Sequence, residues 1–440
     1  MTAREVALQV VRDVFPSSGP QRGAQESLDY RLRAAALDER DRSFATRLAY
    51  GAIEMRRALD WQLEPFIGER RKTLPATTHE ILRLAIYELC YTDSDAYATL
   101  YEFVEIAKRR GHRGLAALAN AVLRSFLREA RRTPARADFA SDDEYLGTLY
   151  SLPDWLVRQW RGAFGANRLE EICAGVNGPA QSAIVANRSR VEPEALAVRL
   201  GEFGVYARRS PFVAESLVLE NTANAAAEAI NAGLWWTQSE SSALAVEVLL
   251  PQPGEDVADA CSGRGNKALQ IAARLGGDGT LVCIDADERK METLQARLQA
   301  YGLHAATEVA DLCHMTSAQR FDRLLLDAPC SGVGVVGRHA EARWRKRSDD
   351  GERLAILQSR LLEAAGGMLH EGGAIVYAVC STDPREGVEV VNAFLARNRF
   401  SRGLVPAHLE AFLTGDGDVL VPPGIDRRDG FYIARVERNL

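Results

Sequence analysis

Two cysteines and an aspartate directly follow two apolar runs that are typical of buried strands. Asp327 and Cys330 follow the run FDRLLL in the hexapeptide DAPCSG, and Cys380 follows the run AIVYAV. Because ligands bind outside the carboxyl ends of parallel strands, these three side chains are expected to line one crevice. A cysteine thiolate is a nucleophile, and a carboxyl group beside it holds or moves a proton. Each cysteine alone fits a small buried hydrophobic residue, but the pair beside Asp327 favours a catalytic site.

A glycine-containing loop and two further aspartates lie at other predicted strand ends. The loop follows the run DVADA, and Asp285 ends the run LVCID about 20 residues after the glycines, where a carboxylate accepts both hydroxyls of a ribose. Asp311 follows the next predicted strand, where it either contacts an adenine amine or serves as a turn residue. Glycines let the backbone approach a ligand, and the next helix presents free N–H groups. The loop residues predicted to bind this ligand are Cys261, Ser262, Gly263, Arg264, Gly265, Asn266 and Lys267.

These residues alone leave the identity of the ligand open. The loop is neither a P-loop, GxxxxGK[ST], nor the GxGxxG of dinucleotide-binding folds. Hydride transfer with NAD is one use of such a layout, although no downstream histidine or Tyr-Lys pair of the dehydrogenase type stands out. The other common ligand of this layout is S-adenosylmethionine.

The elements that must position these residues form three predicted domains in the 440 residues. Apolar residues at three- and four-residue intervals predict an all-helical domain over 1–135. Short β-rich runs around one helix, between about residues 150 and 221, predict a small α+β unit that we assign to 145–225. Over 226–440 strands and helices alternate, which predicts a doubly wound, Rossmann-like α/β domain.

Composition restricts the class of protein. With 47% hydrophobic and 26% charged residues, the chain has the composition of a globular protein. No apolar run approaches the roughly 18 residues of a membrane span, and the N-terminal residues lack the apolar stretch of a signal peptide. We therefore expect no membrane partner and a cytoplasmic location. Seven cysteines without a CxxC pair or a Cys/His cluster predict neither disulfides nor a metal site.

Positive charge is concentrated locally, although the net charge is −6. Residues 101–140 hold nine Lys and Arg against four Asp and Glu, which fits a solvated helix face and an RNA phosphate contact equally well. Residues 337–347, GRHAEARWRKR, hold five Lys and Arg and include Trp344. We expect core burial for this tryptophan and RNA contacts for Arg338, Arg345 and Lys346, since basic groups pair with the phosphates of single-stranded or flipped-out nucleotides.

Several of these motifs resemble those of one enzyme family. LDAPCSGVGVVGRHAEARW and YAVCSTDPREGVEVV resemble motifs IV and VI of the RsmB-like (Sun/Fmu) RNA cytosine-C5 methyltransferases, whose typical forms are DAPCSG, RHPD…W and ATCS…EEN. The run from ELCYTDSDAYATLYEFVEIAKRRG to LANAVLRSF resembles the NusB-like RNA-binding domain of the bacterial small-subunit rRNA members. SLPDWLVRQW and WTQSESSAL also have counterparts there. The resemblance therefore covers nearly the whole chain and implies that the small α+β unit binds RNA.

The resemblance implies S-adenosylmethionine as cofactor and a role for each residue of the crevice. Cys380 is implied to add to C6 of cytosine, which makes C5 a carbon nucleophile toward a methyl group. Cys330 is implied to assist loss of the C5 proton and product release, and Asp327, carrying or sharing a proton, to hydrogen-bond the N3 edge. DNA cytosine methyltransferases give the nucleophilic role to the Pro-Cys cysteine instead, but the presence of both cysteines favours the RNA scheme. A helix expected to begin near Pro384 would favour the Cys380 thiolate.

The chain departs from the family pattern mainly in the glycine loop. The usual CAAPGGK reads CSGRGNK, so that Arg264 replaces the proline and Asn266 the second glycine. Asn tolerates positive φ better than other non-glycine residues, so the loop shape is expected to survive, while Arg264 leaves the details of cofactor contact open. The threonine before the motif VI cysteine is Val379, and RHPD reads RHAE.

The function expected from this resemblance is methyl transfer from S-adenosylmethionine to C5 of a cytosine in small-subunit (16S) rRNA, free or in its assembly particle, by a monomeric protein. Two alternatives stay open. One is cytosine-C5 methylation of tRNA, which the presence of the NusB-like domain disfavours without excluding it. The other is a non-catalytic rRNA-binding or assembly factor that kept the fold after its glycine loop drifted.

Overall fold

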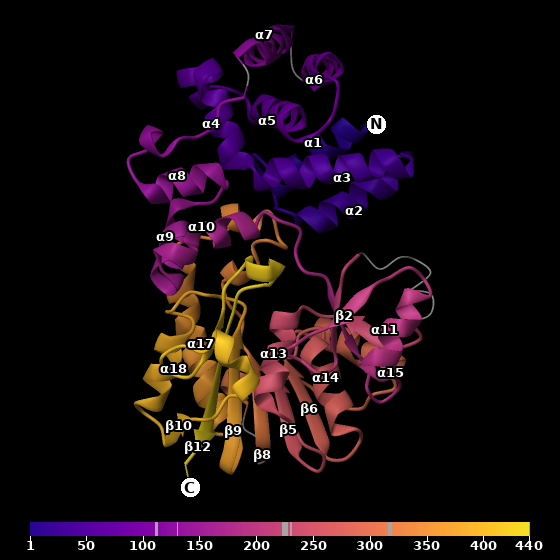
Figure 1. Cartoon of the computed structure of the whole chain (residues 1–440), viewed down its shortest axis with the longest axis vertical. Coiled ribbons are helices and arrows are strands. Elements are labelled where there is room, and N and C mark those ends of the chain that lie inside the picture. Colours follow the sequence, from indigo (N-terminus) through magenta and orange to yellow (C-terminus); the bar gives the residue numbers. More distant parts are fainter. Residues whose placement is uncertain (111–112, 130, 222–227, 229–230, 316–318, 440) are drawn as a thin grey trace. The chain divides into compact units, whose positions relative to one another are not determined.

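The computed structural model describes residues 1–439 except 111–112, 130, 222–227, 229–230 and 316–318. The chain forms two compact units. One unit holds residues 1–161 together with 338–345, and the other holds 162–337 and 346–440. Figure 1 colours the chain from its N-terminus in indigo to its C-terminus in yellow.

The first unit is helical, as the spacing of its apolar residues predicts. Its first helix buries Val6, Val10 and Val14 on one face, where they join the core of the unit. The helices are α1 (Ala3–Val14), α2 (Ala24–Ala34), α3 (Glu39–Glu54), α4 (Arg56–Ile67), α5 (Ala76–Tyr91), α6 (Ala96–Arg110), α7 (Arg113–Glu129), α8 (Asp142–Leu149) and α9 (Asp154–Phe164), with the 3-10 turns η1 (Gly68–Lys72) and η2 (Arg136–Asp138).

Residues 338–345 pack with this helical unit, although in sequence they follow the DAPCSG motif. They include the short helix α16 (Ala342–Arg345). Trp344 packs against the helical core, and its Nε1 donates a hydrogen bond to the Ile53 carbonyl at 2.6 Å. The Ala24 N–H at the start of α2 donates to the Glu341 carboxylate at 2.9 Å. The expected core burial of Trp344 is confirmed only in part, because the side chain is partly buried against this core.

The stretch before the small sheet is more helical than the sequence analysis predicts. The sequence pattern predicts one helix among β-rich runs from about residue 150, but α9 and α10 (Ala166–Gly175) precede the first strand. Leu156, Val157 and Trp160 are fully buried on one face of α9. Val157 and Leu156 precede Trp160 by three and four residues, which is the spacing of an amphipathic helix, although the short apolar runs around them favoured strands.

The small sheet confirms the predicted α+β unit. Its four strands are antiparallel in the order β2-β3-β1-β4. Leu196 and Leu200 of the helix between the first two strands are buried in the same core as the sheet residues. The elements are β1 (Ala183–Ala186), α11 (Pro193–Gly201), β2 (Ala207–Arg209), β3 (Ser216–Leu219) and β4 (Trp235–Thr237).

The large sheet confirms the predicted Rossmann-like domain. Its strand order is β10-β12-β9-β8-β5-β6-β7, with β11 paired to β12. The strands β5 to β9 pair in parallel, whereas β12 runs antiparallel to β9. The strands are β5 (Asp256–Ala260), β6 (Thr280–Asp285), β7 (Ala306–Val309), β8 (Phe321–Asp327), β9 (Leu369–Val379), β10 (Phe400–Arg402), β11 (Val419–Val421) and β12 (Phe431–Arg438).

Helices cover both faces of this sheet. Apolar residues of α13, α14 and α15 share one core with one face, and those of α17 and α18 share another core with the opposite face. The helices are α13 (Glu240–Leu249), α14 (Asn266–Leu275), α15 (Glu288–Tyr301), α17 (Asp350–Gly366) and α18 (Val388–Leu395), with 3-10 turns η3 (Leu312–His314), η4 (Val333–Val335), η5 (Ala407–Phe412) and η6 (Ile425–Arg427).

The strand register brings the predicted site residues to one edge of the sheet. Ala260 of β5 pairs with Ile284 of β6 and with Leu326 of β8, and Asp327 pairs with Ala378 of β9. The loop at 261–265, Asp285 and Cys380 therefore leave the sheet at nearly the same level. This edge is where an open parallel sheet binds its ligands.

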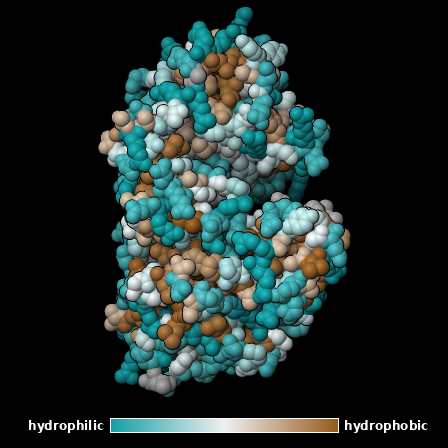
Figure 2. Space-filling view, viewed as in Figure 1, coloured by the Kyte–Doolittle hydropathy of each residue, from teal (hydrophilic) through white to brown (hydrophobic). Residues whose placement is uncertain are grey.

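The surface is mixed in polarity. In the view of Figure 2, hydrophilic residues predominate and hydrophobic residues form separate patches. Among the described residues, no helix combines the length and the apolar character needed to cross a membrane.

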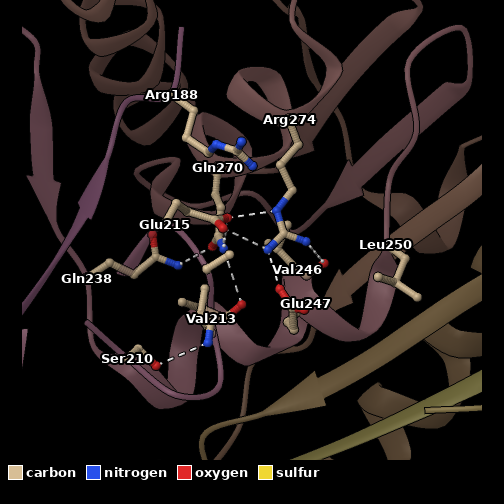
Figure 3. Close-up of polar contacts among 12 residues, drawn as sticks. Arg188, Ser210, Val213, Glu215, Gln238, Val246, Glu247, Leu250, Gln270 and Arg274 are labelled. Carbon is tan, nitrogen blue, oxygen red and sulfur yellow. Dashed lines mark hydrogen bonds and ion pairs between the residues drawn. The ribbon is translucent and has the colours of Figure 1, made fainter. Parts of the chain in front are cut away.

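A buried polar network joins the small sheet to α14 (Figure 3). Arg274 donates through Nε to Glu215, which precedes β3, at 2.7 Å, and it also pairs with Glu247 of α13. Gln270 donates to the same Glu215 carboxylate at 2.8 Å and accepts from Gln238 at 2.9 Å. Charged and amide side chains beside the small sheet and on α13 thus bind Gln270 and Arg274 of α14, which is the helix that begins at the glycine loop.

Candidate functional site

A cavity of about 490 Å³ opens at the carboxyl ends of β5, β6, β8 and β9. Seven of the predicted site residues line it: Cys261, Gly263, Asp285, Asp311, Asp327, Cys330 and Cys380. Among the described residues its wall also includes Ile284, Ala286, Lys290, Ala310, Leu312, Ala328, Pro329, Leu357 and Leu361. The cavity wall therefore combines apolar side chains with carboxylates and thiols.

The glycine loop adopts left-handed backbone conformations at alternate residues. Cys261, Gly263 and Gly265 have φ of 61°, 57° and 85°. A Cβ on Gly265 would lie 2.1 Å from Leu294 Cδ1, so this position requires glycine. Asn266 instead opens α14 with helical geometry, so the expectation that an asparagine must tolerate positive φ here is wrong. The positive-φ positions of this loop thus carry glycine or Cys261, and Asn266 is not among them.

Asp285 ties the loop to the end of β6. Its Oδ2 accepts from the Gly263 N–H at 2.9 Å, and its Oδ1 accepts from the Asp287 N–H at 2.9 Å. The side chain is almost fully buried in the cavity wall. Both oxygens keep lone pairs for further donors. A carboxylate fixed in this way can accept hydroxyl groups from a ligand in the cavity.

The other loop residues differ in where they lie. Ser262 Oγ accepts from the Ile284 N–H at 3.1 Å and so serves the loop scaffold. Arg264 is exposed, and its carbonyl accepts from Arg297. Asp311 lines the cavity while its side chain accepts from the Cys313 N–H at 3.0 Å as the cap of η3. The turn role considered for Asp311 is therefore present together with its place in the cavity wall.

Lys267 and Asp327 form an ion pair at the cavity wall. The distance from Lys267 Nζ to Asp327 Oδ2 is 2.6 Å, and the lysine side chain is only 9% exposed. Burial opposes the charge of Lys267, but the charge of Asp327 and its hydrogen bond with the ammonium outweigh burial and raise the pKa of Lys267. Lys267 is thus a permanent cation at neutral pH, and it sits against the carboxyl group that ends β8.

Asp259 is a buried acid that the sequence analysis did not select. Neither carboxylate oxygen has a hydrogen-bond partner among the described residues, and the residue is 1% exposed. Burial, followed by the charges of Asp327 and Asp285, raises the pKa of Asp259 to about 8, although Lys267 opposes the shift. Asp259, the penultimate residue of β5, therefore holds a proton at neutral pH. Its place inside a strand, DVADA, was the one available signal.

The Asp259→Asn variant is expected to be less sensitive to rising pH than the wild type. An unfolded aspartate releases its proton near pH 3.9, whereas folded Asp259 keeps it until about pH 8. The wild type should thus lose about 1.4 kcal/mol of unfolding free energy per pH unit, relative to the variant, between roughly pH 5 and 7.5. Urea unfolding at pH 5.5, 6.5 and 7.5 measures this. Parallel pH profiles would contradict the assignment, and exposed Asp278→Asn is the control.

The two predicted cysteines lie in contact. Cys330 Sγ and Cys380 Sγ are 3.3 Å apart, and both thiols are free. The hydrogen bond with Cys380, burial, and the nearby charges of Glu386 and Asp327 raise the pKa of Cys330 well above its ordinary value. Cys330 is therefore a thiol that can donate to Cys380. Burial and nearby carboxylates also raise the pKa of Cys261, to about 12, which makes this third cysteine of the cavity a poor nucleophile.

The helix after Cys380 begins later than the sequence analysis predicts. The expected start is near Pro384, but α18 begins at Val388, after a turn in which the Glu386 and Gly387 N–H groups donate to Asp383 O. The helix N-terminus is therefore eight residues beyond the cysteine. This weakens the argument that its dipole acts on Cys380, because that effect is confined to the first turn.

The three predicted RNA-binding residues lie in one segment, half-buried. Arg345 donates to the Val14 carbonyl at 2.8 Å and also to the Arg22 carbonyl, so its guanidinium serves the helical unit. Arg338 belongs to the same unit, whereas Lys346 belongs to the second. RNA contact by these residues stays a prediction.

Comparisons with known proteins agree with this geometry. Residues 246–437 match the family described as 16S rRNA methyltransferase RsmB/F, residues 1–128 match the NusB family, and residues 152–226 match the ferredoxin-like domain of RsmF/B-like methyltransferases. The ribosomal RNA small subunit methyltransferase B of Thermus thermophilus is 35% identical and covers 99% of this chain and 98% of its own length. The chain belongs to the ribosomal RNA small subunit methyltransferase B family.

Other relatives extend this likeness. A probable member of the family from Bacillus subtilis is 31% identical over 93% of both chains. The crystal structure of PH0851 matches 100% of this chain and 99% of its own with a TM-score of 0.79 at 22% identity, which shows a shared fold. The predicted family resemblance is thereby confirmed. The family's members are methyltransferases that depend on S-adenosylmethionine.

The cavity fits this cofactor. Asp285 stands at the end of the second strand, where a carboxylate meets ribose hydroxyls. A Cβ on Gly263 would have no heavy-atom neighbour closer than 4.0 Å, so the backbone faces open space beside that carboxylate. The apolar residues Ile284, Leu312 and Leu361 provide a surface for an adenine ring.

Proposed function

We propose that this protein transfers a methyl group from S-adenosylmethionine to C5 of a cytosine in small-subunit rRNA through a covalent cysteine adduct. The observation that carries the proposal is the 3.3 Å contact between Cys330 and Cys380 on the wall that also holds Asp327. Two thiols in contact suit a reaction in which one sulfur bonds to the base and the other assists its release. The names of the relatives support small-subunit rRNA as the substrate.

S-adenosylmethionine, when bound, supplies an electrophilic methyl group. Asp285 would accept its ribose hydroxyls, and Asp311 would meet its adenine. The remaining contacts would come from the loop residues Cys261, Ser262, Gly263, Arg264, Gly265, Asn266 and Lys267, and from Asp327. Arg264 would contribute through its backbone, because its side chain is exposed to solvent.

Cys380 is the proposed nucleophile. Its sulfur forms a bond to C6 of the cytosine while the C5–C6 double bond opens, which leaves the electron pair spread over C5 and the N3 edge of the ring. The Cys330 thiol is in hydrogen-bond contact with that sulfur, so it can stabilise the thiolate before attack. On release of the product, the Cys330 proton would pass to the departing Cys380 sulfur while the Cys330 sulfur takes up the C5 proton, so that the C6–sulfur bond breaks and the C5–C6 double bond forms again.

Asp327 would meet the N3 edge of the base. A proton must be held there as negative charge develops in the ring. The Lys267 ammonium donates to Asp327 at 2.6 Å, and a proton drawn from it as charge develops in the ring would let Asp327 hydrogen-bond the N3 edge. A carboxylate alone at this position would repel the developing charge.

The RNA must reach this cavity with its target base out of the stack. Arg338, Arg345 and Lys346 follow the Cys330 loop in sequence and remain the proposed phosphate contacts. For Arg345 this would require release of the carbonyls that its guanidinium now binds. We infer a monomer that acts in the cytoplasm on small-subunit rRNA or its assembly particle.

The test is methyl transfer by the wild-type protein. Labelled S-adenosylmethionine is supplied with unmodified small-subunit rRNA, with the assembly particle, or with unmodified tRNA, and the RNA is digested to nucleosides. We expect labelled 5-methylcytidine from small-subunit rRNA, free or in the particle. Label in tRNA alone would show a tRNA enzyme, and label in another nucleoside would exclude C5 chemistry. Cofactor-independent rRNA binding without transfer to any RNA would show a non-catalytic assembly factor.

A further inference from the structure

A buried carboxylate connects the two loops that carry the cysteines. Glu386 is fully buried, and it lies six residues after Cys380 in the turn that precedes α18. It lies outside the cavity wall among the described residues. A fully buried glutamate is rare unless hydrogen bonds satisfy its oxygens, so its contacts explain why it is kept.

Its hydrogen bonds come from both loops at once. Oε1 accepts from the Ser331 N–H at 2.7 Å, and Oε2 accepts from the Ser381 hydroxyl at 2.6 Å and from the Ser331 hydroxyl. Gln358 of α17 donates to Oε1 at 3.1 Å and to the Pro329 carbonyl at 2.9 Å. The two serines, which immediately follow Cys330 and Cys380, also contact each other, with 3.2 Å between their hydroxyl oxygens.

The turn that carries this carboxylate is itself fixed. Tyr377 of β9 donates its hydroxyl to the Glu386 carbonyl at 2.6 Å. Ser331, Ser381 and Gln358 are all buried, so water does not compete for these bonds. Hydrogen bonds to an ionised carboxylate are about twice as strong as neutral ones. The Glu386 carboxylate thus accepts hydrogen bonds from the residue that follows each cysteine. These donors are the N–H and hydroxyl of Ser331 and the hydroxyl of Ser381.

We propose that Glu386 is a positioning residue that holds Cys330 and Cys380 in contact, by binding the two serines that follow them. The catalytic role of this positioning rests on the proposed function, but the hydrogen bonds of Glu386 do not depend on that function. The negative charge of Glu386 has a second effect, because it is one of the groups that keep Cys330 protonated. Glu386 touches neither the cavity nor the sulfurs, so it acts through the two loops.

Two variants separate the geometry from the charge. Glu386→Gln keeps the shape: the amide oxygen accepts from the Ser331 N–H and Gln358, and its NH2 group donates to serine hydroxyls that rotate to accept. Glu386→Ala removes both charge and shape and leaves the serine hydroxyls and the Ser331 N–H without their acceptor. Glu389→Gln is the matched control, because Glu389 is an exposed glutamate three residues farther on.

Phenylarsine oxide measures the pairing of the thiols without any reaction on RNA. It bonds to two adjacent thiols and releases water, so it binds the wild type at Cys330 and Cys380 and fails to bind Cys380→Ala at this site. We expect Glu386→Ala to bind it at least tenfold more weakly, and Glu386→Gln and Glu389→Gln to bind as the wild type does. In Glu386→Gln, alkylation of Cys330 should reach its half-maximal rate at a lower pH, because the charge that opposed ionisation is gone.

Steady-state kinetics gives the second readout. We expect kcat of Glu386→Ala to fall by about 100-fold, the usual effect of a displacement near 1 Å, with KM for cofactor and RNA unchanged. Equal arsenical binding and equal kcat in Glu386→Ala and the wild type would overturn the proposal.

If Glu386→Ala does not fold, the variants Ser331→Ala and Ser381→Ala test the proposal instead. Weaker arsenical binding in either variant supports it, and wild-type binding in both overturns it. Weak arsenical binding by Glu386→Ala supports the positioning role even where the wild type methylates no RNA, which would overturn only the proposed function.

Discussion

Cys380→Ala is expected to form no covalent adduct with RNA and no methylated product, whereas Cys330→Ala is expected to form an adduct that it cannot release. The two sulfurs are 3.3 Å apart, so their positions alone do not separate the roles of the two cysteines. The variants separate these roles by the species that is lost, either the adduct or the released product. Loss of a nucleophile removes the whole covalent route, and rates should fall by at least about 10⁴-fold. Labelled-methyl transfer and denaturing gels of protein with unmodified rRNA measure both effects.

The outcome can contradict the assignment in a defined way. If Cys330→Ala is the variant without an adduct and Cys380→Ala the one that accumulates it, the nucleophile is the Pro-Cys cysteine, as in DNA cytosine methyltransferases. Cys90→Ala, in α5 of the helical unit, is the control for removal of a partly buried thiol and should leave transfer unchanged. Full activity of both Cys330→Ala and Cys380→Ala would exclude covalent catalysis.

The convergence of the site was predictable because it follows from strand periodicity. Apolar runs that end in Asp285, Asp327 or Cys380 mark the carboxyl ends of parallel strands, and the register of the sheet brings those ends to one level. The loop after β5 was predictable for the same reason. Its detailed conformation was not, since the non-glycine residue with positive φ is Cys261 rather than Asn266.

Two functional candidates were missed because their sequence surroundings are misleading. Glu386 lies in the polar run STDPREG, which is typical of a solvent-exposed turn, yet its partners Ser331 and Gln358 are distant in sequence. Asp259 lies between alanines inside the short strand DVADA, where the pattern predicts burial but not a retained proton. Burial of both depends on which chain segments pack together, and no local pattern carries that information.

Residues 338–345 are another case in which the local sequence does not predict which side chains are buried. Its charges are typical of an RNA-binding surface, and the sequence offers no sign that Trp344 donates to Ile53 or that Arg345 binds the Val14 carbonyl. Arg343 in the same segment is fully buried, and burial lowers its pKa while Glu54 opposes the shift. A run of basic residues therefore serves packing within the helical unit as well as any contact with RNA.

Arg274→Met is expected to lower the free energy of unfolding by about 3–5 kcal/mol, because it leaves Glu215 and Glu247 buried without their cation. The arginine side chain is 14% exposed and the two glutamates are 3% and 11% exposed, so solvent screens little of this interaction. Figure 3 shows Arg274 between the two carboxylates, with Gln270 beside it. Urea unfolding at neutral pH measures the loss, and exposed Arg199→Met is the control.

The second substitution identifies the cause of that loss. Glu215→Gln in the Arg274→Met background removes one unpaired buried charge, so it should restore part of the stability, whereas simple loss of packing would not be reversed.

The paired carboxylate also sets the pH dependence of this stabilisation. Burial opposes ionisation of Glu215, but Arg274 outweighs burial and lowers the pKa of Glu215. This contribution is present above the ordinary glutamate pKa near 4.3 and disappears as the pH falls through the lower folded value. The difference between wild type and Arg274→Met should therefore shrink in acid. A constant difference would mean that the network stabilises α14 by shape alone.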